Sequence, residues 1–170
     1  LMAGALVDLV FSLRFLTPAR RAALRISALS AFFEPLMIYN LKRVSALHCP
    51  WGVDRYAGPH PFLRLLDVIP ADWSAGHCFP AGSASSGFAF IAAYPFLRGH
   101  APRLARQWLV GFGLAGLLLG LAQQMRGAHF MSHTLWTAWL CWTCGMVLFW
   151  LRQTLIQRSR VLAGTPLART

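Results

Sequence analysis

Two long apolar runs, residues 107–125 and 134–151, restrict the fold more than any other feature of the sequence. Each is close to the length that a helix needs to cross a bilayer. Only 12% of the 170 residues are charged, whereas soluble domains average about 25%. Shorter apolar runs occupy residues 1–16, 26–41 and 88–97. The sequence therefore predicts an all-α, polytopic membrane helix bundle. We expect a single domain over residues 1–170 with about five transmembrane helices, or six if a helix precedes Leu1.

A short polar stretch, residues 126–133, separates the two long runs and reads Arg-Gly-Ala-His-Phe-Met-Ser-His. Ionisable side chains beside a segment of bilayer length are costly unless they have a role. If the second run begins as a helix near Ser132, the spacing of four puts His129 and His133 near one face. Arg126 adds a fixed positive charge, so the cluster suits an anion, phosphate in particular. The alternative is that both His residues only cap or pack at the membrane interface.

The net charge of +11 is clustered, and three basic segments stand out, at residues 17–25, 98–106 and 152–160. We expect them to be loops on the cytoplasmic side, where positive charge is retained, and not a nucleic-acid-binding surface. The spans between them then place residues 42–83 and 126–133 together on the opposite side. In a bacterium this predicts the inner membrane, with these polar stretches facing the periplasm.

The longest polar connection, residues 42–83, contains Lys42 and His77 and is punctuated by Pro residues that favour turns. A connection of this length without an obvious long element is usually functional. Within it, residues 62–69 are predicted to form a short interfacial helix. Its last part reads Pro-Ala-Gly-Ser-Ala-Ser-Ser-Gly over residues 80–87.

This last part leads directly into an apolar run, so we expect a helix to begin there. Gly82 allows close approach of the backbone, and Ser83 or Ser85 is expected to cap the helix. Free N–H groups at a helix N-terminus can also bind an anion. Capping without any ligand is the simpler alternative.

The four Cys residues fall into two pairs with different surroundings. Cys49 and Cys78 lie in the polar connection, and they can form a disulfide if that side of the membrane is oxidising. The sequence leaves this pairing open. Cys141 and Cys144 lie inside an apolar run and are expected to be small buried residues. Because the His residues are scattered along the chain, we expect neither a metal nor another cofactor.

Three short sequence motifs resemble those of a bacterial membrane-associated subgroup of the type 2 phosphatidic acid phosphatase superfamily. They are His-Cys-Pro-Trp at residues 48–51, Cys-Phe-Pro-Ala-Gly at 78–82 and Arg-Gly-Ala-His-Phe at 126–130. Lys42 also matches the Lys of the first motif of that family. The resemblance covers residues 26–151, the core of the predicted domain.

The resemblance implies phosphate-ester hydrolysis through a phosphohistidine, without a metal. His129 aligns with the His that attacks phosphorus, and His133 with the Asp that orients it. Ser83 stands where the family has the His that protonates the leaving oxygen. Together these three are the expected catalytic residues. The expected substrate-binding residues are Lys42, His77, Gly82, Ser85 and Arg126.

Three positions depart from the family pattern. Cys49 and Gln123 replace Arg residues, and Ser83 replaces the acid His. A Ser cannot act as a proton donor near pH 7 as His can. Either His77 supplies the proton, or the leaving group has a low pKa and needs no acid, or this protein is catalytically impaired.

Three functions are compatible with these features. The first is a membrane phosphatase that acts on a lipid phosphate or diphosphate at the outer leaflet. The second is a non-catalytic protein that binds a lipid phosphate through a decayed site. The third is a fragment of a transporter or channel in which His129 and His133 relay protons. This third function requires ionisable residues deep in the spans, and only Asp8 and Glu34 come near them.

Overall fold

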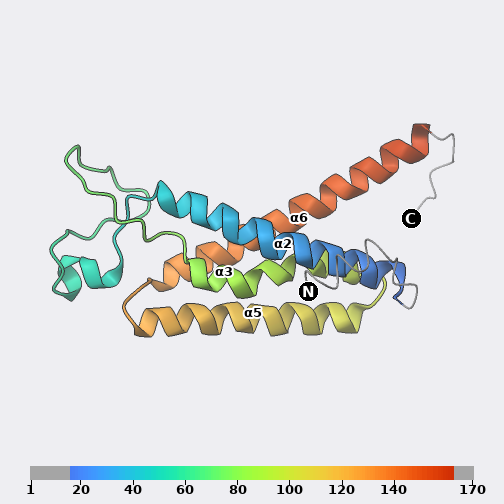
Figure 1. Ribbon diagram of the computed structural model, residues 1–170, viewed down its shortest axis with the longest axis horizontal. Helices are drawn as coiled ribbons and strands as arrows, with labels where there is room; N and C mark the ends of the chain where they lie inside the picture. Colours follow the sequence, from blue (N-terminus) through green and yellow to red (C-terminus); the bar gives the residue numbers. More distant parts are fainter. Residues whose placement is uncertain (1–15, 163–170) are drawn as a thin grey trace.

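The computed structural model describes residues 16–162, which form a bundle of helices (Figure 1). The three long helices are α2 (Pro18–Arg43), α5 (Pro102–Met125) and α6 (Met131–Leu162). A shorter helical segment consists of α3 (Gly82–Phe88), the 3₁₀ turn η3 (Ala89–Ala93) and α4 (Tyr94–Leu97). The connection before α3 holds two further 3₁₀ turns, η1 (Pro50–Gly52) and η2 (Asp54–Tyr56). Because the described residues contain no β-strand, the all-α prediction is confirmed.

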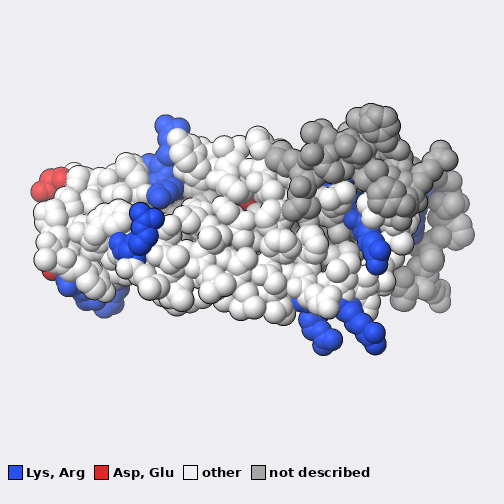
Figure 2. Space-filling model, turned by 60° about the horizontal axis from the view of Figure 1, so that its bottom comes forward, with Lys and Arg blue, Asp and Glu red and all other residues white. Residues whose placement is uncertain are grey.

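The three long helices are each long and apolar enough to cross a membrane. Large apolar side chains such as Phe32, Leu118 and Trp139 are exposed on their outer surfaces. On the face shown in Figure 2, Lys and Arg gather toward the two ends and leave a band between them without Lys or Arg. This distribution is that of a membrane helix bundle. The apolar run at residues 1–16 lies outside the described residues, except for Leu16.

The basic segment at residues 17–25 is not a loop as expected, because helix α2 already begins at Pro18. The Thr17 hydroxyl accepts a hydrogen bond from the Arg20 amide at 3.4 Å and caps the helix. Pro at the first helical position and the Ala, Leu and Arg residues that follow all favour helix. Most of the other two basic segments is likewise helical, within α5 and α6. The basic residues thus lie largely on helix ends.

The segment from α3 to α4 is the interior of the bundle. Ala81, Ala84, Phe88 and Ile91 pack with Cys141 of α6 in one buried cluster. A Cβ atom on Gly87 would overlap the backbone of Gly116 in α5. Small residues therefore let the backbones of α3 and α5 approach closely. This packing fixes the N-terminal end of α3 beside the first turns of α6.

Helix α6 packs against the bundle mainly through its first half, and further along the helix Phe149 and Arg152 contact the ring of Phe96 in α4. Its buried residues recur at helical spacing and are His133, Thr134, Thr137, Cys141 and Gly145. The last turns of α6 extend away from the other helices (Figure 1). The packed half is the one that carries His133, so the candidate site stands on the rigid end of the helix.

The connection between α2 and α3 is irregular, and its residues 62–69 do not form the predicted helix. The Asp67 carboxylate instead accepts a hydrogen bond from the Arg64 amide at 2.8 Å. Such a local side-chain bond offers the backbone a turn in place of a helix. The disulfide between Cys49 and Cys78 joins the two ends of this connection. The pairing left open by the sequence is therefore present.

Candidate functional site

The turn between α5 and α6 positions His129. Helix α5 ends at Met125, and Gly127 adopts the left-handed conformation with φ of 68°. The Gly127 amide donates to the Gln124 carbonyl at 2.9 Å, and the Ala128 amide donates to the Gln123 carbonyl at 2.8 Å. A glycine in this conformation is the usual end of a helix. The chain therefore turns sharply and directs His129 back into the bundle.

His133 lies in the first turn of α6, and Thr137 ties that turn to the start of α3. The Thr137 hydroxyl donates to the His133 carbonyl at 2.8 Å. The same hydroxyl accepts a hydrogen bond from the Ala81 amide at 2.9 Å. All three groups are buried. The segment before α3, which carries Cys78, is thus held against the two His residues.

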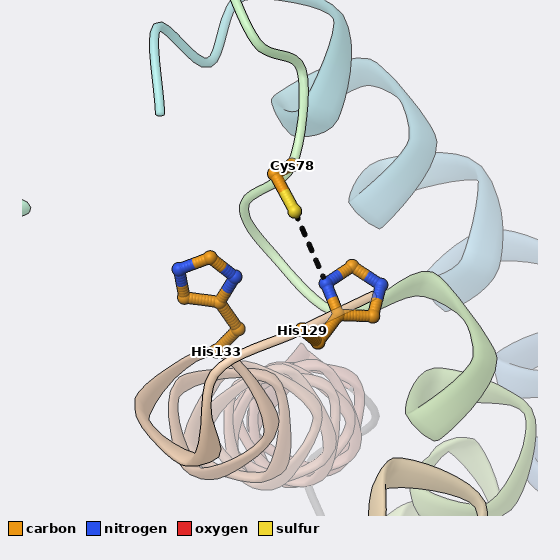
Figure 3. Close-up of side chains that lie close together, drawn as sticks. All are labelled: Cys78, His129 and His133. Atoms are coloured by element: carbon orange, nitrogen blue, oxygen red, sulfur yellow. Dashed lines mark hydrogen bonds between the residues drawn. The ribbon is translucent and has the colours of Figure 1, made fainter. Parts of the chain in front are cut away.

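Three buried side chains, Cys78, His129 and His133, meet at this end of the bundle (Figure 3). The sulfur of Cys78 lies 3.6 Å from Nδ1 of His129, along the dashed line in Figure 3. Because this sulfur is part of a disulfide, it has no proton to donate. Any hydrogen bond here is donated by the Nδ1–H of His129 to the sulfur, a weak acceptor. The lone pair of His129 is then on Nε2.

The surroundings of His129 favour its neutral form. The side chain is only 6% exposed. Burial, and next the positive charge of Lys42, lower the pKa of His129 from 6.5 to about 4, while the Cys78 backbone partly offsets this. A neutral imidazole with a free ring nitrogen is a nucleophile near pH 7. The proximity of Lys42 also means that an anion beside His129 would meet a positive charge.

His133 is close to His129 but does not hold it through a hydrogen bond. The two ring centroids are 5.8 Å apart, and no hydrogen bond between the rings occurs in the described structure. Phe79 and Phe130 pack edge-on against the His133 ring, each at 5.3 Å. Nδ1 of His133 is buried without a partner. The group at Nδ1 of His129 is therefore Cys78, and the orienting role of His133 stays a prediction.

The same three side chains are the candidate ligands for a metal. One ligand atom from each lies within 4.8 Å of the others. A disulfide sulfur, however, is not the thiolate that binds zinc. Two imidazoles then remain, which is fewer than the three or four protein ligands of ordinary zinc sites. The oxidised protein therefore offers an incomplete ligand set here.

The first turn of α3 lacks the Ser cap that was expected from the sequence. Ala81 is the N-cap residue, and no side chain caps the helix. The buried Ser85 hydroxyl donates to the Gly82 carbonyl at 2.7 Å and points into the bundle. The hydroxyl of the half-buried Ser83 makes no hydrogen bond to another described residue. A Cβ atom on Gly82 would meet nothing within 4 Å, so open space lies beside this residue.

Lys42 and His77 line an open groove on the end of α2. Its volume is about 430 Å³, and its walls are Tyr39, Lys42, Arg43 and His77. Nδ1 of His77 lies 3.3 Å from the Lys42 carbonyl, to which it donates. The Arg126 side chain, by contrast, is exposed and has no hydrogen bond, ion pair or ring contact with another described residue. The predicted substrate-binding residues therefore do not all converge.

Two features of the site were not expected from the sequence. Cys78 contacts His129, and Thr137 connects α6 to α3. The possible pairing of Cys49 with Cys78 was the only signal for the first contact. Arg43 also lines the groove beside Lys42.

Comparison of the chain with protein-family models, with curated proteins and with solved structures finds no match.

Proposed function

We propose that the protein is a membrane phosphatase of the type 2 phosphatidic acid phosphatase kind, acting on a lipid phosphate or diphosphate. The observation that carries this proposal is His129, a buried imidazole with a lowered pKa beside the charge of Lys42. Nε2 of His129 attacks phosphorus and the leaving oxygen departs. Water then releases phosphate from the phosphohistidine. Lys42 stabilises the negative charge of the phosphate oxygens.

The absence of an acid at position 83 favours a particular leaving group. A Ser hydroxyl does not protonate an alkoxide near pH 7. When His129 attacks the terminal phosphorus of a lipid diphosphate, the leaving group is the lipid monophosphate, a stable anion that needs no proton. Among lipid phosphates, we therefore expect a polyprenyl diphosphate to react faster than a monoester such as phosphatidic acid.

The disulfide between Cys49 and Cys78 supports the location that we propose. Disulfides form and persist in oxidising spaces such as the periplasm. The basic ends of the helices favour the cytoplasm for the opposite end of the bundle. We therefore propose the inner membrane of a bacterium, with His129 facing the periplasm.

The test is phosphate release in detergent from a panel of lipid monophosphates and diphosphates. We compare wild type with His129→Ala, Ser83→His and the control His100→Ala. His100 is an exposed His between α4 and α5, at the end of α5 away from the site. We expect His129→Ala alone to abolish release and to abolish the phosphoenzyme trapped by rapid denaturation. Ser83→His should accelerate hydrolysis of monoesters by about 100-fold, the usual contribution of a general acid.

A second function, binding of a lipid phosphate without turnover, is favoured by one observation. Ser83 leaves the site without an acid, while Lys42 and Arg43 still line a groove that suits an anion. If only Ser83→His turns over, the site is correct and this copy lacks its acid. If no folded variant releases phosphate but wild type still binds the lipid phosphate, the binding function replaces the enzymatic one.

A further inference from the structure

The connection between α2 and α3 presents a run of apolar side chains that nothing in the bundle covers. Leu66 is 93% exposed and Val68 is 91% exposed, and their neighbours Leu65 and Ile69 are exposed as well. They belong to residues 62–69, which we call the apolar loop. Contiguous exposed apolar side chains usually mark a contact surface. In a chain whose helices can cross a membrane, the nearest apolar partner is lipid.

The apolar loop lies at the level of the membrane surface. Leu63 and Leu65 line a cavity together with Trp136 in the second turn of α6. From Trp136 to Arg152 the helix advances about 24 Å at 1.5 Å per residue, slightly less than the roughly 30 Å of a hydrocarbon core. Trp residues are enriched at the border of that core. Leu63 and Leu65, which line the cavity together with Trp136, therefore lie near the border of the hydrocarbon core.

The cavity beneath the loop connects apolar surface with the candidate site. Its volume is about 90 Å³, and Phe62, Phe79 and Phe130 contribute aromatic walls. His133 also lines it. Trp136 belongs both to this cavity and to a shallow groove of about 270 Å³ on the outer surface of α6. Trp136 is therefore a wall that the groove and the cavity share.

We propose that the apolar loop inserts into the outer boundary of the bilayer and that a lipid chain enters the cavity between this loop and Trp136. The polar end of that lipid is thereby brought to His133, whose Nδ1 has no protein partner. That this polar end is a phosphate rests on the proposed function, whereas the membrane contact does not.

Apolar contact, and not charge, holds the loop in the membrane. Arg64 and Asp67 are its only charged residues and are of opposite sign. Arg55 stacks over the ring of Phe62 at 4.2 Å and adds one further cation beside it. We therefore expect insertion into vesicles of neutral phosphatidylcholine, with little dependence on salt.

The first test measures depth and needs no enzymatic activity. A nitroxide is attached at Leu66→Cys, or at the control Asp72→Cys, after Cys141 and Cys144 have been replaced by Ala. In phosphatidylcholine vesicles, the label at position 66 should collide several-fold more with oxygen than with a water-soluble nickel chelate. The label at position 72, an exposed charged position in the same connection, should show the reverse. If the two labels are equally accessible to nickel, the proposed insertion is wrong.

The second test measures lipid entry. Leu66→Asp combined with Val68→Asp should lower kcat/KM for a long-chain lipid phosphate in vesicles by about tenfold, the effect of losing roughly one buried apolar side chain. Turnover of a short-chain, water-soluble ester should be unchanged. Ala71→Asp, at another exposed position, is the matched control. Equal loss with both substrates would overturn lipid entry. If wild type hydrolyses neither ester, the proposed function fails, while the depth measurement still decides the membrane contact.

Discussion

At the scale of single residues, the two nitrogens of His129 have different surroundings. Nδ1 faces the disulfide sulfur of Cys78 at 3.6 Å. A donor bond from Nδ1 fixes the tautomer and leaves Nε2 as the nucleophilic atom. The disulfide sulfur is then the partner of Nδ1, whereas the family resemblance assigns that orienting position to His133. Buried neutral His residues of this kind are candidates for catalysis because their pKa is shifted by identifiable causes.

The pH dependence of His129 follows from those causes. Because burial and the charge of Lys42 lower its pKa to about 4, His129 stays neutral as the pH falls from 7 to 5 and becomes protonated only near pH 4. We expect kcat/KM to be flat from pH 5 to 7 and to decline below that range. Loss of activity between pH 7 and 5 would contradict this expectation and would indicate another titrating group.

A spectroscopic control tests the same prediction without turnover. Histidine side-chain NMR should show an imidazole that titrates near pH 4 and is missing from His129→Ala. In Lys42→Gln this midpoint should rise, because one of the two causes is removed. It should stay below 6.5, because burial is the larger cause.

At the scale of elements, contact between backbones builds the bundle. Gly87 of α3 faces Gly116 of α5, and Gly116 in turn faces the ring of Phe88. Membrane helices gain little from the hydrophobic effect between them, so close packing of small residues is a main source of association. The start of α3 and the turn that carries His129 are placed by these contacts.

Substitution of one of these glycines should therefore disturb stability and site together. We expect Gly87→Ala to destabilise the protein by about 1–3 kcal/mol, the usual cost of overpacking, and to lower its unfolding midpoint in detergent. The matched control is Gly111→Ala on α5, where a Cβ would meet nothing within 4 Å. Alanine favours helix over glycine by about 1 kcal/mol, so the control should be unchanged or more stable. Equal effects of both substitutions would show that α3 and α5 are not in backbone contact.

Glu34 is a further feature of the helix packing. It lies in α2 directly before Pro35 and is fully buried. Its carboxyl oxygens have no hydrogen bond of good geometry, although the side chains of Ser30 and Cys141 lie beside them. Its surroundings were not predictable from the sequence. The structure shows that it belongs to a buried polar face of α2 that also includes Ser27.

At the scale of the whole molecule, the bundle has two chemically different ends. One end carries the Cys49–Cys78 disulfide and the buried His residues, and the other carries the connection between α4 and α5 with His100. The proposed orientation puts the first end outside the cytoplasm. Orientation decides which leaflet supplies the lipid, so it constrains both proposals.

Orientation can be measured in intact bacterial cells. We expect a membrane-impermeant thiol reagent to modify Asp72→Cys in intact cells and to modify His100→Cys only after lysis. Wild type is the control for background, since Cys141 is buried and Cys144 half-buried. Modification of His100→Cys, but not of Asp72→Cys, in intact cells would reverse the proposed orientation and place the site in the cytoplasm.

The sequence by itself determined the class of fold and the location of polar residues along the chain. Apolar runs of bilayer length predict helices because a bilayer leaves backbone groups no other hydrogen-bonding partners. Helix boundaries were less predictable, since basic segments such as residues 17–25 are strong helix formers as well as topology signals. The predicted helix at residues 62–69 does not form, and the Asp67 carboxylate there accepts a local hydrogen bond from the Arg64 amide.

Only the tertiary structure decided which polar residues meet. Lys42, Cys78 and His129 are far apart in the sequence, and their proximity depends on the packing of α2, α3 and α6. Arg126 is three residues from His129 yet lies exposed, because the left-handed turn at Gly127 changes the direction of the chain between them. The spacing of residues along the sequence predicts which side chains are neighbours within one helix. Contacts between helices depend on how closely their backbones approach, and here small residues set that distance.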